Sequence, residues 1–369
     1  MIYMDHAATT SVDSEVLAVM MPYFSTSFGN ASGGYGLARE ARHVIDAARC
    51  EMAKAMGVQR SEVYFTSGGS ESDTWALLGA ATAQMQKKHI ITSQIEHHAV
   101  LHTCAALERW GWQVTYLDVD EKGRVSKDDF LKAIRPDTLM ASVMMANNEV
   151  GTIEPIAELT EIAHAHGILM HTDAVQAAGH IPIRMDELPL DMLSLSSHKF
   201  GGPKGIGALI VRDGVRLNSL IFGGAQERGL RAGTENVPGI VGMAHALSLS
   251  VQHMAENTRR VSRLRDELER ALMDIPGIWV NGDRENRLPG HLHVTVAGMH
   301  STALLMRLDM AGIAASSGSA CASGAAERSH VLQAMGAQMG ADVRFSLGSD
   351  NTEDEIAAVA AAMRQILKR

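Results

Sequence analysis

The sequence predicts an α/β protein with one large domain and one smaller domain. Short apolar runs that suit buried strands alternate with helical segments along most of the chain, and glycine-rich turns separate them. A length of 369 residues is too great for a minimal domain and suits a large domain with a companion. Shorter elements begin near Pro276. We therefore expect a large domain at 15–259 and a smaller domain built from 1–14 and 260–369.

The composition is that of a globular protein of enzyme size. Hydrophobic residues make up 46% of the chain and charged residues 20%, and no apolar run reaches the length of a membrane span. The first ten residues lack the basic start and apolar stretch of a signal peptide, so we expect a cytoplasmic location. A net charge of −9 argues against broad nucleic-acid binding, and we expect no direct contact with nucleic acid.

The sulfur-containing residues indicate neither a disulfide framework nor a metal site. Cys50, Cys104 and Cys321 are too scattered for paired disulfides and lack the close spacing of zinc ligands. We expect Cys50 to be a packed thiol within a helix at Leu37–Met56. The 22 methionines are expected to fill irregular gaps in the core rather than to bind a metal.

A strand, a glycine turn and a helix follow one another near residue 70. Val63–Thr66 reads as a strand, Ser67–Ser70 as a tight turn and Glu71–Ala83 as a helix. This order directs backbone N–H groups and the positive end of the helix dipole toward one point, which suits a single phosphate group. The spacing of a dinucleotide site or a P-loop is absent from this stretch. An ordinary connection between strand and helix is the alternative.

Polar side chains also follow three later strands of the predicted sheet. His97 opens a helix, where a histidine is usually a cap but could stack on a ring. Asn147 and Asn148 end a strand and suit either hydrogen bonds to a ligand or the capping of a turn. Asp173 ends another buried strand, where it could cap a helix or pair with a cation such as a pyridinium nitrogen.

A lysine follows the apolar run Leu188–Leu193, which we interpret as a buried strand. Lys199 lies between small polar residues and a glycine-rich turn, at a point where a sheet meets a loop. Partial burial there disfavours the ammonium form and leaves an amine that can form a Schiff base with an aldehyde cofactor, most commonly pyridoxal phosphate. Lys204, in the mobile turn that follows, is the rival candidate.

Three features of the second half of the chain complete the candidate site. The long glycine-rich loop Phe222–Thr234 is of a length that is seldom without function. Cys321 lies in a stretch of small residues that cannot bury it well, which favours an accessible thiol. Arg344 lies between apolar residues, where it could bind a carboxylate in a bidentate manner or form a structural salt bridge.

Taken together, these motifs resemble the pyridoxal-phosphate-dependent cysteine desulfurases of the NifS/IscS type, which belong to the class V aminotransferases. The resemblance covers nearly the whole chain in the family's order. The motifs that carry it are Asp5-His6-Ala7-Ala8-Thr9-Thr10, Phe65-Thr66-Ser67-Gly68-Gly69-Ser70-Glu71-Ser72, Glu96-His97-His98-Ala99-Val100, Asn147-Asn148-Glu149, Asp173-Ala174-Val175-Gln176, Ser196-Ser197-His198-Lys199, the stretch Gln226–Thr234, Ser316–Cys321 and Arg344-Phe345-Ser346-Leu347-Gly348. The resemblance implies fold type I, with a large domain whose mostly parallel sheet is flanked by helices and a smaller α+β domain.

The resemblance also implies a role for each matching residue. Lys199 would form the Schiff base with the cofactor, His97 would stack on its ring, and Cys321 would be the nucleophile. The remaining cofactor contacts would come from Gly69, Ser70, Asn148, Asp173, Gln176, Ser196, His198 and, from the neighbouring subunit of a homodimer, Thr234. In this set Asp173 would pair with the pyridinium nitrogen, Gln176 with the ring hydroxyl, and Ser70, Ser196 and His198 with the phosphate. Asn148 and Arg344 would bind the substrate carboxylate.

The implied reaction converts L-cysteine to L-alanine and leaves a persulfide on Cys321 that passes to an acceptor protein, in iron–sulfur cluster assembly, tRNA thiolation or related sulfur transfer. A selenocysteine lyase or a class V aminotransferase is the alternative, and a non-catalytic binding module has no need of Lys199. Two departures from the family are the serine at Ser70, where threonine is usual, and the absence of a tail after the last helix. The second departure leaves the acceptor open.

Overall fold

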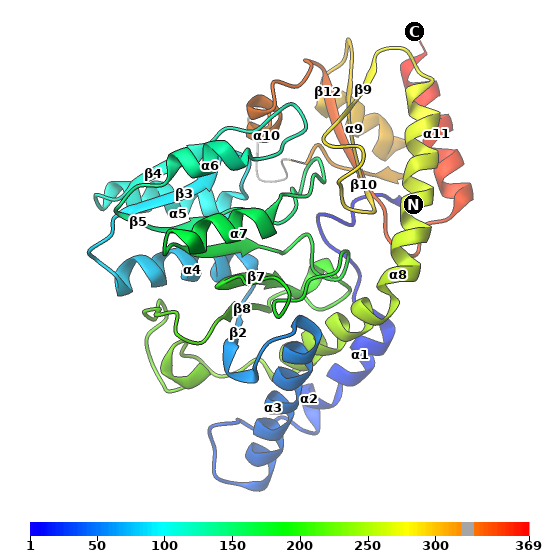
Figure 1. Ribbon diagram of the computed structural model, residues 1–369. Coiled ribbons are helices and arrows are strands. Elements are labelled where there is room, and N and C mark those ends of the chain that lie inside the picture. The colour runs from blue at the N-terminus through cyan, green and yellow to red at the C-terminus, as the bar shows by residue number, and fades with distance from the viewer. Residues whose placement is uncertain (319–327, 369) are drawn as a thin grey trace.

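The computed structural model describes residues 1–318 and 328–368, and its main element is a seven-stranded sheet (Figure 1). The strand order is β2-β8-β7-β6-β5-β3-β4. Five neighbouring strands from β7 to β4 pair in parallel, whereas β8 runs antiparallel to both β7 and β2. The strands are β2 (Val63–Thr66), β3 (His89–Ser93), β4 (Gln113–Leu117), β5 (Thr138–Ser142), β6 (Leu169–Asp173), β7 (Met192–Ser196) and β8 (Gly207–Val211). The predicted α/β fold with a mostly parallel sheet is confirmed.

Helices cover both faces of this sheet because successive strand residues point to opposite sides. Ile91 packs in a core with α3 (Gly36–Met56), α6 (Lys127–Ala133), α7 (Ile156–Ala165) and the first half of α8 (Val237–Met273). Its neighbour Ile90 packs on the other face, with α4 (Gly69–Ala83) and α5 (His98–Arg109). Apolar strands buried on two faces are typical of parallel sheets between helical layers.

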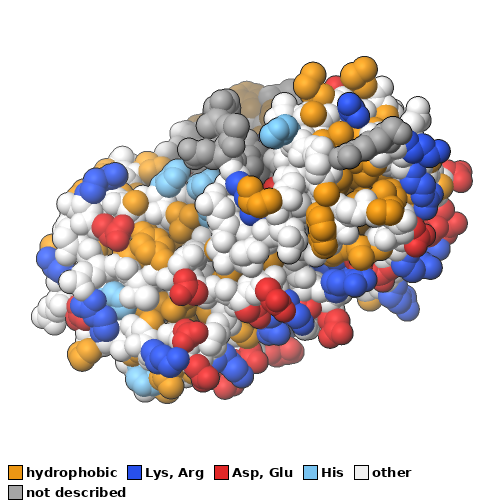
Figure 2. All heavy atoms as spheres, turned by 90° about the horizontal axis from the view of Figure 1, so that it is seen from above, with side chains coloured by type: hydrophobic (Ala, Val, Ile, Leu, Met, Phe, Trp, Pro, Cys, Tyr) orange, Lys and Arg blue, Asp and Glu red, His pale blue; other side chains and the backbone are white. Residues whose placement is uncertain are grey.

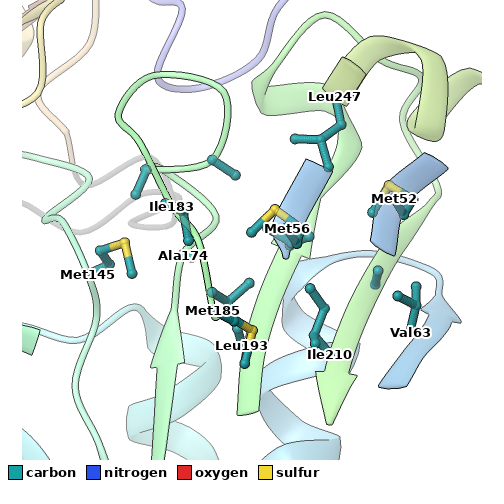
Figure 3. Packing of buried hydrophobic residues seen from close by; sticks show 14 of the residues in the cluster. Met52, Met56, Val63, Met145, Ala174, Ile183, Met185, Leu193, Ile210 and Leu247 are labelled. Atoms are coloured by element: carbon teal, nitrogen blue, oxygen red, sulfur yellow. The ribbon is translucent and has the colours of Figure 1, made fainter. Parts of the chain in front are cut away.

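Methionines fill much of the first of these cores. Figure 3 shows Met52 and Met56 of α3 and Met185 from the loop before β7 among branched side chains of the sheet, such as Leu193 and Ile210. All three methionine side chains are buried. The flexible thioether side chain suits the uneven space between a helix and a twisted sheet, as the sequence predicted.

A second, smaller core surrounds a three-stranded antiparallel sheet. Its order is β12 (Ala341–Ser346), β10 (His291–Val296) and β9 (Ile278–Asn281). The second half of α8, together with α9 (Ser301–Met310) and α11 (Glu353–Leu367), packs against it. The N-terminal strand β1 (Ile2–Tyr3) pairs in parallel with β11 (Ile313–Ala314) and so joins the start of the chain to this part. The remaining short helices are α1 (Ser14–Met20), α2 (Pro22–Ser25) and α10 (His330–Ala334).

The long helix α8 connects the two cores (Figure 1). Residues Val237–Leu247 contribute to the large core, and Val261–Leu272 contribute to the small one. The division that we predict at residue 260 therefore falls inside a continuous helix. The division into two domains remains a prediction, and α8 contributes to the cores of both.

Two local predictions were wrong. The strand before Lys199 is β7, Met192–Ser196, and not Leu188–Leu193, because Pro189 lacks the N–H that a central strand needs. Cys50 is exposed, since it lies on the face of α3 opposite to the buried positions Ile45, Ala48 and Met52. In the part of the chain that the structure describes, no helix has both the length and the apolar character needed to cross a membrane.

Candidate functional site

A cavity of about 630 Å³ lies at the carboxyl ends of the parallel strands, where loops from several strands meet. Open α/β sheets bind ligands at this edge. Ten of the twelve predicted site residues line the cavity: Gly69, Ser70, His97, Asn148, Asp173, Gln176, Ser196, His198, Lys199 and Arg344. Segments more than 270 residues apart in the sequence therefore converge on one space.

The turn between β2 and α4 forms one wall of the cavity. Gly69 begins α4, and a Cβ atom there would lie 2.6 Å from Val175 Cγ2, so only glycine lets this turn approach the loop after β6. The Glu71 carboxylate accepts a hydrogen bond of 2.7 Å from the Ser67 N–H and thereby fixes the turn. The first N–H groups of a helix have no partner within the helix, and here they begin at the cavity wall. This geometry suits a phosphate.

His97 lines the cavity and also caps a helix. It is the residue before α5, and its Nδ1 accepts a hydrogen bond of 3.1 Å from the Ala99 N–H. That bond assigns the ring proton to Nε2 and fixes the orientation of the ring. Burial lowers the pKa of His97, while the nearby Asp173 acts in the opposite direction.

The two asparagines after β5 have different environments. The Asn147 side chain accepts hydrogen bonds from the N–H groups of Glu149 and Val150 and donates to the carbonyl of Ile95. It therefore caps the turn, as the alternative interpretation of the sequence proposed. Asn148, held in place by this turn, lines the cavity.

Asp173 ends β6 with its carboxylate at the cavity and only 6% of the residue exposed. Its Oδ1 accepts a hydrogen bond of 2.8 Å from the Val175 N–H. Burial raises the pKa of Asp173, and the charges of His97 and Lys199 oppose this rise. A buried carboxylate of this kind favours a cationic partner in the cavity. Gln176, one turn further, donates a hydrogen bond of 2.9 Å to the carbonyl of Ala7.

Lys199 lies in a short 3₁₀ turn directly after β7 and is half-buried, whereas its rival Lys204 is exposed, although both line the cavity. The Lys199 Nζ donates hydrogen bonds to the carbonyls of Ala7 at 2.6 Å and Ala8 at 2.9 Å. Next to it, burial and the charge of Lys199 lower the pKa of His198 to about 4. His198 is therefore neutral near pH 7 and acts as a hydrogen-bonding group there.

Arg344 enters the cavity from β12 of the small sheet and is 2% exposed. Its guanidinium donates to the Asn148 carbonyl at 2.6 Å, the Asp5 carboxylate at 2.7 Å and the Ser316 hydroxyl at 3.0 Å. Its Nε is buried and has no hydrogen-bond partner among the described residues. A ligand carboxylate is the natural partner for the donors that remain. The predicted salt bridge is thus present, with Asp5, and the binding of a ligand carboxylate by the remaining donors stays a prediction.

One predicted site residue within the described part of the chain does not line this cavity. Thr234 is exposed and lines a separate cavity of about 190 Å³ that shares Ser67 and Gly205 with the larger one. Its predicted contact is with the cofactor of a neighbouring subunit. Cys321 lies outside the described residues.

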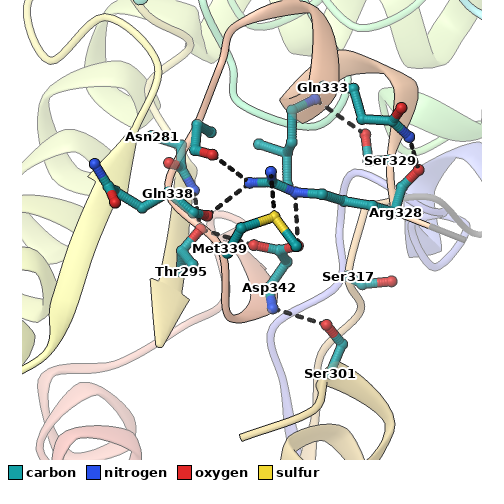
Figure 4. A network of polar contacts seen from close by, with 12 residues as sticks. Asn281, Thr295, Ser301, Ser317, Arg328, Ser329, Gln333, Gln338, Met339 and Asp342 are labelled. Atoms are coloured by element: carbon teal, nitrogen blue, oxygen red, sulfur yellow. Dashed lines mark hydrogen bonds and ion pairs between the residues drawn. The ribbon is translucent and has the colours of Figure 1, made fainter. Parts of the chain in front are cut away.

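The two residues that follow the segment 319–327 are held by polar contacts. Arg328 donates to the carbonyls of Ala337 and Gln338 at 2.8 and 2.6 Å and lies 3.9 Å from the Asp342 carboxylate (Figure 4). The hydroxyl of Ser329 donates to the carboxyl of Glu149, whose pKa burial raises to about 7. Figure 2 shows histidine side chains on the surface beside the residues that are not described. These contacts hold Arg328 and Ser329 against described residues of the structure.

Several cavity residues were missed in the sequence. They are the carbonyl groups of Ala7 and Ala8, the carboxyl of Glu149, and the imidazoles of His98 and His330, whose rings lie 4.8 Å apart. Backbone carbonyls leave no signal in a sequence. Glu149 could have been found from the sequence, because it directly follows Asn148, which was already a predicted site residue.

A family model described as "Aminotransferase class-V" matches residues 2–359. The chain belongs to this family. Over its full length the class-V chain is 49% identical to "Cysteine desulfurase IscS" of Methanosarcina thermophila, of which the match covers 92%. A solved "NifS-like protein" superposes with a TM-score of 0.94 at 39% identity, covering 99% of each chain. Another solved structure, "SspA in complex with cysteine", has a TM-score of 0.84 at 38% identity and covers 95% of this chain and 100% of its own.

The class-V family uses pyridoxal phosphate, and the cavity residues fit this cofactor. Three groups line the same cavity: the amine of the half-buried Lys199, the start of helix α4 and the buried carboxylate of Asp173. These are the groups that an aldehyde, a phosphate and a pyridinium nitrogen require. Within residues 1–318 and 328–368, no three His, Cys, Asp or Glu side chains are grouped in a way that could hold a metal ion.

Proposed function

We propose that this class-V protein is a cysteine desulfurase that converts L-cysteine to L-alanine and passes the sulfur, through a persulfide on Cys321, to an acceptor protein. One observation carries the proposal: the amine of Lys199, the carboxylate of Asp173 and the guanidinium of Arg344 line the same cavity. The full-length similarity to a chain named cysteine desulfurase and to a protein solved with cysteine supports this choice of substrate.

The cofactor would be held by residues from five loops. Lys199 would bind it covalently, Asp173 would pair with its ring nitrogen, His97 would stack on its ring, and Gln176 would contact its ring hydroxyl. The phosphate would be bound by Gly69, Ser70, Ser196 and His198, and by the partner subunit's Thr234. Since the pKa of His198 is lowered to about 4 by burial, its contribution would be a hydrogen bond rather than a charge.

Substrate binding would use the small sheet. Arg344 and Asn148 would bind the carboxylate of L-cysteine, with the buried Nε of Arg344 among the available donors. When bound, the cofactor withdraws electrons from the substrate Cα and so makes its proton acidic. Lys199 would then take up that proton at Nζ, since its amine is positioned in the same cavity.

The sulfur step would use Cys321 as a thiolate. Its Sγ would attack the substrate sulfur, forming a new S–S bond while the C–S bond breaks. The electron pair of the broken bond stays with the carbon, which takes up a proton and leaves as L-alanine. The persulfide on Cys321 then gives its outer sulfur to the thiol of an acceptor protein, whose identity the chain leaves open.

The proposed enzyme is a homodimer. Thr234 is exposed outside the main cavity of its own chain, which supports a contact with a second copy. Large apolar side chains also protrude from the described surface, with Phe28 67% and Phe222 84% exposed. Exposed aromatic side chains of this size are typical of interfaces. Sedimentation of the purified protein at twice the mass of the chain is the expected result.

The function is tested by adding L-cysteine and a reductant to the purified protein with its cofactor and measuring alanine and sulfide together. Equal amounts of both products are expected. Cys321→Ser should retain the cofactor absorbance and lose both products, whereas Lys199→Ala should lose the absorbance of the bound cofactor.

Two results would contradict the proposal. Alanine release by Cys321→Ser at the wild-type rate would remove the nucleophile assignment. Cofactor absorbance without either product would favour an aminotransferase, which a screen of amino donors and keto acids would then identify.

A further inference from the structure

The N-terminal segment Asp5–Ala8 lies between two cationic residues of the cavity, Lys199 and Arg344. On one side the carbonyls of Ala7 and Ala8 accept the hydrogen bonds of Lys199 Nζ. On the other side, the Asp5 carboxylate accepts a hydrogen bond of 2.7 Å from Arg344 Nη2. The segment is therefore part of the cavity wall rather than a free end, although its sequence reads equally well as an ordinary turn.

Pairing with the small sheet holds this segment in place. Asp5 forms a β-bridge with Ser346 in strand β12, two residues after Arg344. The His6 N–H donates to the Ser346 carbonyl at 3.1 Å, and the Ala7 N–H donates to its hydroxyl at 2.9 Å. Because these bonds hold the backbone of both residues after Asp5, the Asp5 carboxylate is presented to Arg344 from a fixed position.

The hydrogen bonds of Arg344 define the plane of its guanidinium. A guanidinium is planar and carries five N–H donors. Here Nη1 donates to the Asn148 carbonyl, and Nη2 donates to Asp5 and to the Ser316 hydroxyl. The Nε–H and one N–H of Nη1 remain, and Nε is buried without a partner among the described residues. Because three of the five N–H donors are already occupied, only the Nε–H and one N–H of Nη1 are left for a ligand.

Asp5 is the only charged group among these three acceptors. Arg344 is 2% exposed, so water contributes little to its solvation, and the Asp5 side chain is 19% exposed. A hydrogen bond between two charged groups is shorter and stronger than a neutral one. Of the three acceptors, Asp5 therefore does most to fix the orientation of the Arg344 guanidinium.

The geometry points to Asp5 as the residue that positions Arg344 for the α-carboxylate of the amino-acid substrate. This inference rests on the proposed function only in its choice of an amino acid as ligand. Asp5 contacts neither the reacting atoms nor the carboxylate. It acts by holding the guanidinium so that its remaining donors face the ligand.

The test compares two ligands that differ only in the carboxylate. L-alanine and ethylamine are titrated into the cofactor-loaded protein, and the dissociation constant of each is read from the change in cofactor absorbance. Asp5→Ala is expected to weaken L-alanine binding about tenfold, the effect of losing one well-oriented charged hydrogen bond, and to leave ethylamine binding unchanged. Asp5→Asn retains an acceptor for Nη2 and should restore binding to within about threefold of wild type.

The matched control is Asp350→Ala. The Asp350 carboxylate lies near the same segment, 3.3 Å from His6 Nε2, but has no contact with Arg344. It should bind both ligands and melt as wild type does, whereas Asp5→Ala, which leaves the buried Arg344 without its charged partner, should melt at a lower temperature. Neither ligand requires sulfur chemistry, so the test is independent of desulfurase activity.

Three outcomes would overturn the inference. Wild-type affinity of Asp5→Ala for L-alanine would show that Arg344 is oriented without Asp5. Equal weakening of L-alanine and ethylamine would show a general structural effect. A wild-type protein that does not prefer L-alanine to ethylamine would show that no α-carboxylate is bound at all.

Discussion

Glu154 offers a test of the electrostatics of the large core that is separate from catalysis. Its side chain lies in the loop after β5, and the residue is 4% exposed. One carboxyl oxygen accepts a hydrogen bond of 2.9 Å from the Val125 N–H, and the other has no partner among the described residues. Burial raises the pKa of Glu154 to about 8 from its ordinary value of 4.5. The perturbation is Glu154→Gln, which keeps the shape and cannot ionise.

The magnitude follows from proton linkage. Between pH 4.5 and about 8 the unfolded chain has lost the Glu154 proton while the folded chain retains it. The folded state then binds more protons, so the contribution of this group to stability is complete below pH 4.5 and is lost as pH rises to about 8. Each pH unit in that window costs about 1.4 kcal/mol, which gives about 4 kcal/mol between pH 5 and pH 9. Because Glu154→Gln cannot ionise, the variant does not lose this free energy of unfolding as the pH rises.

The measurement is the free energy of unfolding from urea titrations at pH 5, 7 and 9 for wild type and variant. The variant should become more stable relative to wild type as the pH rises, with no further gain above pH 9. Glu158→Gln, at a half-exposed position in α7, is the control and should follow the wild-type curve. A constant difference between Glu154→Gln and wild type across this range would show that the carboxyl ionises in the folded protein as it does in water.

Two further predictions concern buried groups outside the cavity. The Glu227 carboxylate accepts hydrogen bonds of 2.6 and 2.7 Å from Arg49 and one of 3.0 Å from the Phe65 N–H. Glu227→Ala should therefore lower the free energy of unfolding in urea by about 3–5 kcal/mol, because Arg49 stays buried without its partner, and a loss below about 1 kcal/mol would contradict this. Burial raises the pKa of the Cys104 thiol to about 12, so mass spectrometry after brief iodoacetamide treatment should find Cys50 alkylated and Cys104 alkylated only after unfolding, and equal labelling would refute it.

Local elements were predictable because their signals are local. The strand Val63–Thr66 has its predicted bounds, and the helix that we predict at Glu71–Ala83 begins two residues earlier, at Gly69. The helix at Leu37–Met56 begins at Gly36 and ends at the predicted residue, where Gly57 adopts a left-handed φ of 68°. Apolar periodicity and glycine stops depend on neighbours a few residues apart, which a single sequence displays.

Contacts between distant segments were not predictable in this way. The sequence gives no indication that Asp5 pairs with a strand that begins at Ala341, or that Lys199 donates to the carbonyls of Ala7 and Ala8. Such contacts depend on the packing of the whole chain. The resemblance to a family placed the residues in one site, but it assigned no role to the carbonyls that surround them.

The structure also shows why single-residue interpretations left capping and ligand binding as alternatives. His97 accepts a backbone N–H at the start of α5, and Asp173 accepts one in the turn after β6, yet both line the cavity. In each case the capping bond uses one atom of the side chain and fixes the direction of the rest. A ligand site at strand ends needs side chains with fixed orientations, and a cap provides this at little entropic cost. Capping and ligand binding are therefore compatible at these positions, since the first orients the group that the second requires.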